Sequence, residues 1–216
     1  WKGCLITNLP VYFIEHYKFF SNSSKIYGKE NDNQRFAFFN LACLKLLKTL
    51  NWQPDIIHCH DWQTGLIPYF LNNPNDLINQ DFFKNTATVF TIHNLVYQSG
   101  HNWWEIPEKL RDDGQTKLPA FESQEFERIN FAKRSILDAQ IINTVSETYA
   151  KEILEKNSGQ DLYLLLRNRA NRLFGIVNGI DYKDYNPATD QNLYENYSKD
   201  KFGGKLKNKL ALQRKL

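Results

Sequence analysis

The sequence is poor in sulphur and has no long apolar stretch. It contains no methionine, and its three cysteines, Cys4, Cys43 and Cys59, are widely spaced and form no CxxC pair. Three scattered cysteines predict a reducing compartment without a disulfide framework. No run of about 18 apolar residues occurs, so we expect neither a membrane span nor a membrane partner. Because translation starts with methionine and cores use it to fill gaps, its absence predicts an internal piece of a longer protein.

Three common site motifs are also missing. The glycine patterns GxGxxG and GxxxxGKS/T do not occur, so the usual phosphate-binding loops of nucleotide sites are excluded within the chain. No serine lies in the GxSxG context of a hydrolase nucleophile. The formal net charge is only +3, and the excess of Lys and Arg is gathered after residue 198. This is not the pattern of a nucleic-acid-binding domain, so we expect no nucleic-acid partner.

The sequence does contain a regular alternation of short apolar segments and helical patterns. Hydrophobic residues make up 42% of the chain and aromatic residues 14%, which excludes a disordered chain. The pattern predicts strands at 11–14, 55–58, 87–92, 139–144 and 173–177, and helices at 34–50, 64–71 and 121–137. A further helix is expected after a capping box formed by Thr144 or Ser146 with Glu147. We therefore predict an α/β fold with a Rossmann-like, doubly wound parallel sheet at 1–190 and a basic linker at 191–216.

Polar residues follow each predicted strand where the strand ends. The second strand runs into His58, Cys59, His60 and Asp61, the third into His93 and Asn94, and the last into Asn178. The carboxyl ends of parallel strands share one edge of a sheet, and ligands bind there in open α/β folds. We expect these residues to converge on one polar rim.

A metal site is one interpretation of this rim. His58 and His60 form an HxH pair on one face of an extended segment, but only His93 and His101 lie downstream and no HxxE or HExxH spacing occurs. We therefore expect no metal, and the default interpretation of His58 is a buried histidine bonded to backbone.

A sugar site is the other interpretation. Hydroxyl groups need fixed donors and acceptors, and the apolar face of a pyranose rests on aromatic rings. Suitable substrate-binding groups near the rim are Trp62, Gln63, Asn94, Tyr97 and Gln98. Trp103 and Trp104 are either a further sugar platform or loop packing.

Several strings of the chain, in this order, resemble the bacterial glycogen synthases and plant starch synthases. The most specific are HCHDWQTGLIP, TIHNLVYQSG, NTVSETYAKEI and GIVNGIDYKDYNPATD. VYFIEHYKFF, YGKENDNQRFAFF and INFAKRSILDAQ are similar to further family segments, so the resemblance extends from about Val11 to Gln213. The family's opening strand and its Lys-x-Gly-Gly-Leu loop have no counterpart in the chain.

The resemblance implies the N-terminal, acceptor-side half of a GT-B glycosyltransferase. The implied enzyme transfers glucose with retention from ADP-glucose, or UDP-glucose in some members, to the non-reducing end of an α-1,4-glucan. The resemblance implies no cofactor and no metal, because the nucleotide sugar is a co-substrate. It also implies that most contacts to the nucleotide sugar come from a second domain. The implied location is the bacterial cytoplasm, or the plastid stroma in a photosynthetic eukaryote. A non-catalytic glucan-binding domain and a GT-B transferase with another sugar nucleotide remain as alternatives.

The resemblance also implies roles for single residues. His93 of TIHN matches the family histidine that bonds the transferred glucose, and Asp61 of HDW matches the catalytically important aspartate. Asn178 of NGID is similar to an asparagine of the same pocket, and Tyr27 of YGKE to an acceptor-side tyrosine. Many members have histidine where this chain has Gln63, so we expect position 63 to bind substrate without transferring a proton.

Overall fold

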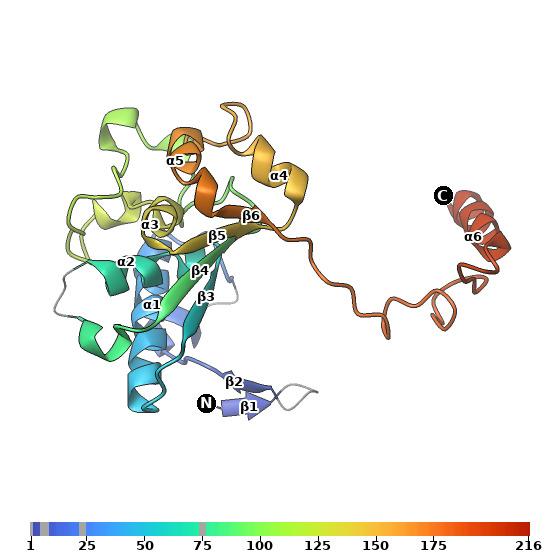
Figure 1. The fold of residues 1–216 in the computed structure, drawn as a ribbon, viewed down its shortest axis with the longest axis horizontal. Coiled ribbons are helices and arrows are strands. Elements are labelled where there is room, and N and C mark those ends of the chain that lie inside the picture. Colours follow the sequence, from blue (N-terminus) through green and yellow to red (C-terminus); the bar gives the residue numbers. More distant parts are fainter. Residues whose placement is uncertain (1, 5–8, 22–24, 74–76) are drawn as a thin grey trace. The chain divides into compact units, whose positions relative to one another are not determined.

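In the computed structural model, four parallel strands form a sheet surrounded by helices (Figure 1). The structure describes residues 2–4, 9–21, 25–73 and 77–216. It divides into two compact units, Trp1–Val177 and Asn178–Leu216. In the first unit the strands β3 (Ile56–His60), β4 (Ala87–Ile92), β5 (Ile141–Thr144) and β6 (Leu173–Gly175) lie side by side in chain order. The predicted Rossmann-like parallel sheet is thereby confirmed.

The prediction of a fifth parallel strand at 11–14 is wrong. That segment forms β2 (Pro10–Tyr12), which pairs antiparallel with β1 (Lys2–Cys4) in a separate two-stranded sheet. Only five residues connect the two strands. A parallel crossover needs about a dozen residues or more, so a connection this short permits only the antiparallel pair.

The helices follow the predicted order, with different starts. The α-helices of the first unit are α1 (Asp32–Thr49), α2 (Leu66–Asn72), α3 (Phe131–Asp138), α4 (Glu147–Glu152) and α5 (Tyr163–Asn168). A π-helical segment, η1 (Tyr17–Ser21), precedes α1. The first unit also contains the short 3-10 turns η2 (Trp62–Thr64), η3 (Gln80–Phe83), η4 (Trp103–Glu105), η5 (Glu108–Leu110), η6 (Phe126–Arg128) and η7 (Ala170–Arg172). The helix predicted at 121–137 is wrong before residue 131, because Asn130 caps α3 by accepting the backbone N–H of Lys133 at 2.8 Å.

Of the two predicted caps of α4, Ser146 is confirmed, whereas Thr144 and its capping box with Glu147 are wrong. Ser146 caps α4 by accepting the N–H of Tyr149 at 3.1 Å. Thr144 is fully buried, and its hydroxyl donates to the carbonyl of Ile92 on the neighbouring strand at 2.8 Å. A hydroxyl satisfied inside the sheet is not free to cap a helix.

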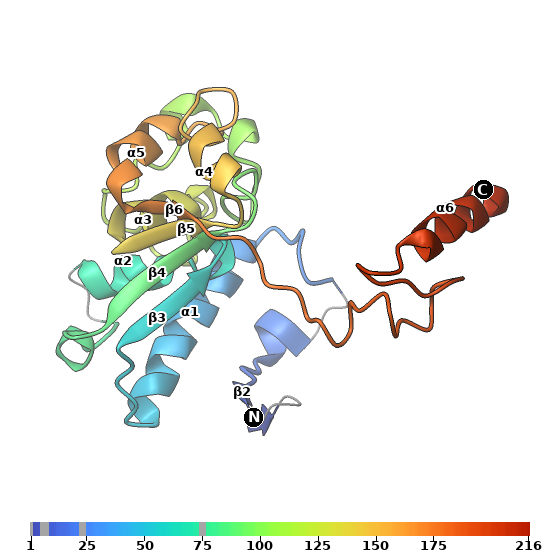
Figure 2. The same ribbon diagram turned by 45° about the vertical axis from the view of Figure 1, so that its right-hand side comes forward.

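The core lies between the sheet and the helices that pack on it (Figure 2). Phe90 on β4 and Ile142 on β5 are at most 1% exposed, and Phe70 of α2 and Phe131 of α3 are equally buried. Burial of each such side chain stabilises the fold by about 1.5–3 kcal/mol. This packing fixes the carboxyl ends of β3 and β4, where the predicted site residues lie.

The second compact unit consists of Asn178–Leu216. It contains α6 (Gly203–Lys215), preceded by a turn in which Asn196 donates to the carbonyls of Pro187 and Asp190. The predicted change from domain to linker at residue 190 stays a prediction. Within the described residues, no helix is both long enough and apolar enough to cross a bilayer.

Candidate functional site

Asp61 and His93 meet at the carboxyl ends of β3 and β4. The two strands are paired in parallel with His60 opposite Thr91, so the residues that follow them lie next to each other. One carboxylate oxygen of Asp61 accepts the backbone N–H of His93 at 2.8 Å, and the N–H of Asp61 donates to the carbonyl of Thr91 at 2.9 Å. The structure thus brings together the two residues to which the resemblance assigns catalysis.

The backbone of Asp61 is strained. Its φ of 53° and ψ of −176° lie in a region that glycine adopts and other residues rarely do. Such a conformation costs on the order of 1–3 kcal/mol and persists only where its surroundings determine it. The two hydrogen bonds to β4 hold this conformation and aim the carboxylate at the end of that strand.

Three imidazoles cluster at the same edge. Nδ1 of His60 lies 3.0 Å from Nε2 of His93, and the rings of His58 and His60 are 4.2 Å apart. The pKa of His58 is lowered by partial burial and by His93, and the pKa of His60 by partial burial, His58 and His93. Both shifts favour the neutral form of the imidazole.

The expectation for His58 is wrong. Its side chain is exposed, and its Nε2 bonds the hydroxyl of Thr91 at 2.6 Å instead of a backbone group. The reason is its place on β3, the outer strand of the described sheet. No group of three or more His, Cys, Asp or Glu side chains is arranged to hold a metal ion in the part of the chain that the structure describes.

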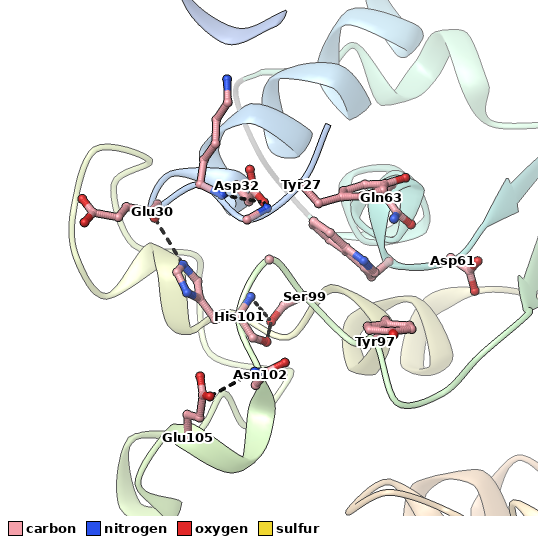
Figure 3. Close-up of a pocket in the computed structure, with 14 residues that line it drawn as sticks. Tyr27, Glu30, Asp32, Asp61, Gln63, Tyr97, Ser99, His101, Asn102 and Glu105 are labelled. Atoms are coloured by element: carbon pink, nitrogen blue, oxygen red, sulfur yellow. Dashed lines mark hydrogen bonds between the residues drawn. The ribbon is translucent and has the colours of Figure 1, made fainter. Parts of the chain in front are cut away.

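A cavity of about 760 Å³ opens beside Asp61 (Figure 3). Figure 3 shows Asp61 and Tyr97 at one end of it and Glu30 and Glu105 at the other. Five predicted site residues line it: Tyr27, Asp61, Trp62, Gln63 and Tyr97. Lining residues that sequence reasoning missed include Glu30, Asp32, Ser99, His101, Asn102 and Glu105.

Asp32 at the start of α1 builds one wall of the cavity. Its carboxylate accepts the N–H of Gly28 at 2.8 Å and that of Lys29 at 3.2 Å, which fixes the loop carrying Tyr27. Gly28 has a φ of +85°, where a side chain would be strained. The same carboxylate forms a buried ion pair with Arg35, so the charge of Asp32 is compensated away from water.

His101 builds the opposite wall. Its Nε2 lies 3.1 Å from Glu127 and 3.2 Å from the carbonyl oxygen of Glu30. The hydrogen bond with Glu127 raises the pKa of His101 above its ordinary value. Glu127 also accepts the N–H groups of Asn33 and Gln34 in the first turn of α1, where a negative charge complements the helix dipole.

Gln98 and Trp62 belong mainly to the interior. Gln98 is 1% exposed; its amide donates to the carbonyls of Leu95 and Gln160 and accepts from Asn130 at 2.6 Å. Because both ends of its amide are already hydrogen-bonded inside the protein, the prediction that Gln98 contacts the sugar is wrong. Trp62 is 4% exposed and packs edge-on against Phe36 at 4.8 Å, so only its border reaches the cavity.

The remaining predicted residues lie outside the cavity lining. Asn94 is exposed next to His93, and its side chain accepts the N–H of Val96 at 3.1 Å. Asn178 is the first residue of the second unit and is exposed. Trp103 lies under the guanidinium of Arg111 at 5.0 Å and does not line the cavity, which favours loop packing over a sugar platform.

Comparisons with known proteins agree on one family. The family model described as the starch synthase catalytic domain matches residues 1–168. The glycogen synthase of Geotalea daltonii is 43% identical over 98% of this chain, and glycogen synthase 2 of Geobacter sulfurreducens is 44% identical over all of it. The catalytic domain of starch synthase IV from Arabidopsis thaliana, bound to ADP and acarbose, superposes on the whole chain with a TM-score of 0.74 and 34% identity. The chain spans 44% of the length of each of these three proteins.

Proposed function

Because the chain belongs to the starch synthase catalytic domain family, with the Rossmann-like fold of one half of a GT-B enzyme, we propose that it is the acceptor-side part of a retaining glucosyltransferase. The enzyme moves glucose from a nucleotide-glucose to the non-reducing end of an α-1,4-glucan. One observation carries the proposal: Asp61 lines a cavity of about 760 Å³, and its carboxylate accepts the backbone N–H of the neighbouring His93. That volume is typical of a small-molecule site.

The acceptor glucan occupies the cavity beside Asp61. Tyr27 and Tyr97, which are 54% and 59% exposed, offer aromatic faces to the sugar rings. Gln63, Ser99 and Asn102 offer neutral hydrogen-bonding groups that match hydroxyls. A chain of neutral sugars needs such a lining of rings and polar groups, and it needs no net charge.

His93 and Asp61 act at the transferred glucose. His93 is exposed at the rim, where its ring can hydrogen-bond a sugar hydroxyl. Asp61 places a carboxylate beside the position where positive charge develops on the sugar in an oxocarbenium-like transition state. The strained backbone of Asp61 fixes this charge before substrate arrives, and preorganised charges of this kind cost no rearrangement during reaction.

The remaining substrate contacts come from outside this chain's cavity. The ADP bound to starch synthase IV supports ADP-glucose as the donor. The family resemblance implies that a second domain supplies most of the contacts to the nucleotide. Asn178 contributes to the same sugar pocket, as the family resemblance implies. No cofactor takes part, and the enzyme works in the bacterial cytoplasm or in a plastid stroma.

Glucose incorporation tests the proposal. The full-length protein is incubated with radiolabelled ADP-glucose and a maltooligosaccharide, and the products are separated by length. We expect elongation by single glucose units with α-1,4 linkage. Binding of the oligosaccharide without incorporation would favour a non-catalytic glucan-binding domain, and incorporation from a different sugar nucleotide alone would favour another GT-B transferase.

A further inference from the structure

The rim contains a histidine that the proposed reaction does not yet use. His60 is the last residue of β3, and its Nδ1 lies 3.0 Å from Nε2 of His93, with the two ring centroids 5.3 Å apart. His93 itself is exposed, and no other hydrogen bond to its ring is formed by the residues that the structure describes. His60 is therefore the group that restrains the His93 imidazole.

His60 is in turn held in place through its backbone. Its N–H donates to the hydroxyl of Thr64 at 2.6 Å, and that hydroxyl lies 2.9 Å from the carbonyl oxygen of His60. Both contacts close the turn between β3 and η2 around the residue. The orientation of His60 is thus set by the end of the strand and does not depend on a ligand.

A chain of hydrogen bonds across the sheet anchors the ring stacked beside His60. The hydroxyl of Thr91 donates to the side-chain oxygen of Asn143 at 2.6 Å, so its oxygen is left to accept a proton from Nε2 of His58. This fixes the tautomer of His58 and the position of its ring, which lies 4.2 Å from that of His60. The ring of His58 is therefore held by hydrogen bonds that connect the three neighbouring strands β3, β4 and β5.

The contact between His60 and His93 links their tautomers. A hydrogen bond between two neutral imidazoles contains one proton, so a donor on one ring requires a bare nitrogen on the other. In either arrangement Nε2 of His93 is engaged and Nδ1 of His93 has one defined role, as donor or as acceptor. Partial desolvation and neighbouring imidazoles lower the pKa of His60, which favours its neutral form.

We infer that His60 is a positioning residue for the proposed glucosyl transfer: through its hydrogen bond it holds the ring of His93 in the orientation in which Nδ1 of His93 faces the sugar. The inference rests on the proposed function. An imidazole that rotates freely presents the wrong nitrogen for part of the time, and misplacement of a reacting contact lowers the rate.

Matched substitutions at residue 60 test the hydrogen bond in the full-length protein. In His60→Asn the amide reaches the position of Nδ1, whereas in His60→Gln it reaches that of Nε2, and His60→Ala has neither. We expect His60→Ala and His60→Gln to lower kcat roughly tenfold, with KM for ADP-glucose changed by less than about twofold. His60→Asn should stay within about threefold of the unsubstituted enzyme. Equal loss in Asn and Gln would overturn the inference.

A double-mutant cycle tests whether His60 acts through His93. The variant with both His60→Ala and His93→Ala should be no slower than His93→Ala alone, because the partner that His60 positions is already gone. Losses that multiply would mean that His60 acts independently, and the inference would be wrong.

A spectroscopic measurement separates this inference from the proposed function. In protein labelled with ¹⁵N-histidine, the ring nitrogens of His93 should report a hydrogen bond at Nε2 in the unsubstituted protein and in His60→Asn, and its loss in His60→Ala. The same Nε2 signal in His60→Ala as in the unsubstituted protein overturns the positioning role. The expected signals in a protein that transfers no glucose instead leave the positioning intact and refute the proposed function.

Discussion

Replacing Asp61 separates what its carboxylate does for the fold from what it does for the proposed reaction. Asp61→Asn keeps a side-chain oxygen that can accept the N–H of His93, and it removes the charge. Asparagine has the same branching as aspartate, so the backbone strain is the same in both proteins, and we expect the free energy of unfolding to change by less than about 1 kcal/mol. We expect kcat to fall by roughly 10²–10³, the usual effect of removing one preorganised electrostatic contact.

Asp61→Gly provides the matched comparison. Glycine relieves a backbone strain on the order of 1–3 kcal/mol, but it loses the charge-assisted bond to His93, worth about 1.5–3 kcal/mol, and costs about 0.5–1 kcal/mol in unfolded-chain entropy. The midpoints of these ranges leave a net loss of about 1 kcal/mol, so the urea midpoint of Asp61→Gly should fall only slightly below that of the unsubstituted protein while activity is lost.

Two assays on each variant decide the matter: initial rates of glucose incorporation and the midpoint of urea unfolding. Activity of Asp61→Asn within about threefold of the unsubstituted enzyme would show that the charge is not needed. A large loss of stability in Asp61→Gly would show that the bond between Asp61 and His93 outweighs the strain, and the energetic reasoning would be wrong.

Four further outcomes are expected. His93→Ala in the full-length enzyme should lower kcat by roughly 10²–10³, and turnover within about twofold would contradict its role. Gln98→Leu leaves the buried amide of Asn130 without its acceptor and should cost about 1–3 kcal/mol, seen as a lower urea midpoint with unchanged KM for the glucan. Because Glu127 raises the folded pKa of His101, their contact stabilises fully below the unfolded pKa of about 6.5 and is lost as pH rises through the folded value. The melting temperature of His101→Gln should therefore fall further below that of the unsubstituted protein at pH 6 than at pH 8.5, and equal gaps would contradict this. Dialysis against EDTA should leave glucose incorporation unchanged, and a loss restored by one divalent cation would refute a metal-free mechanism.

The central sheet could be predicted from sequence because its strands are marked locally. The segment at 87–92 is apolar on both faces and ends in His93 and Asn94, and it forms β4 with the predicted bounds. Parallel pairing then places the residues after β3 and β4 together, so the meeting of Asp61 and His93 follows from topology alone.

Features that depend on distant contacts could not be predicted in this way. Phe121 and Phe126 lie in the stretch predicted as helix, yet Phe121 lies in a turn and Phe126 in η6, because α3 starts only after the cap residue Asn130. His101 lines the cavity because the loop that carries it lies against the start of α1. This contact brings together residues about 70 positions apart in the sequence. No pattern of spacing in the sequence reports such a contact.

The completely buried side chain of Asn33 has a practical consequence. Its amide nitrogen donates to the carbonyls of Phe126 and Ile129, and its oxygen accepts the N–H of Gly100 at 2.8 Å. This one side chain joins the first turn of α1, the Ser99–His101 loop and the chain before α3, so the walls of the glucan cavity are fastened to each other before any sugar arrives. If the proposed function is correct, the acceptor glucan binds to walls that are already held together, so that little ordering entropy is lost on binding. Engineering of acceptor length should exchange outward-facing groups such as Tyr97 and leave Asn33 untouched.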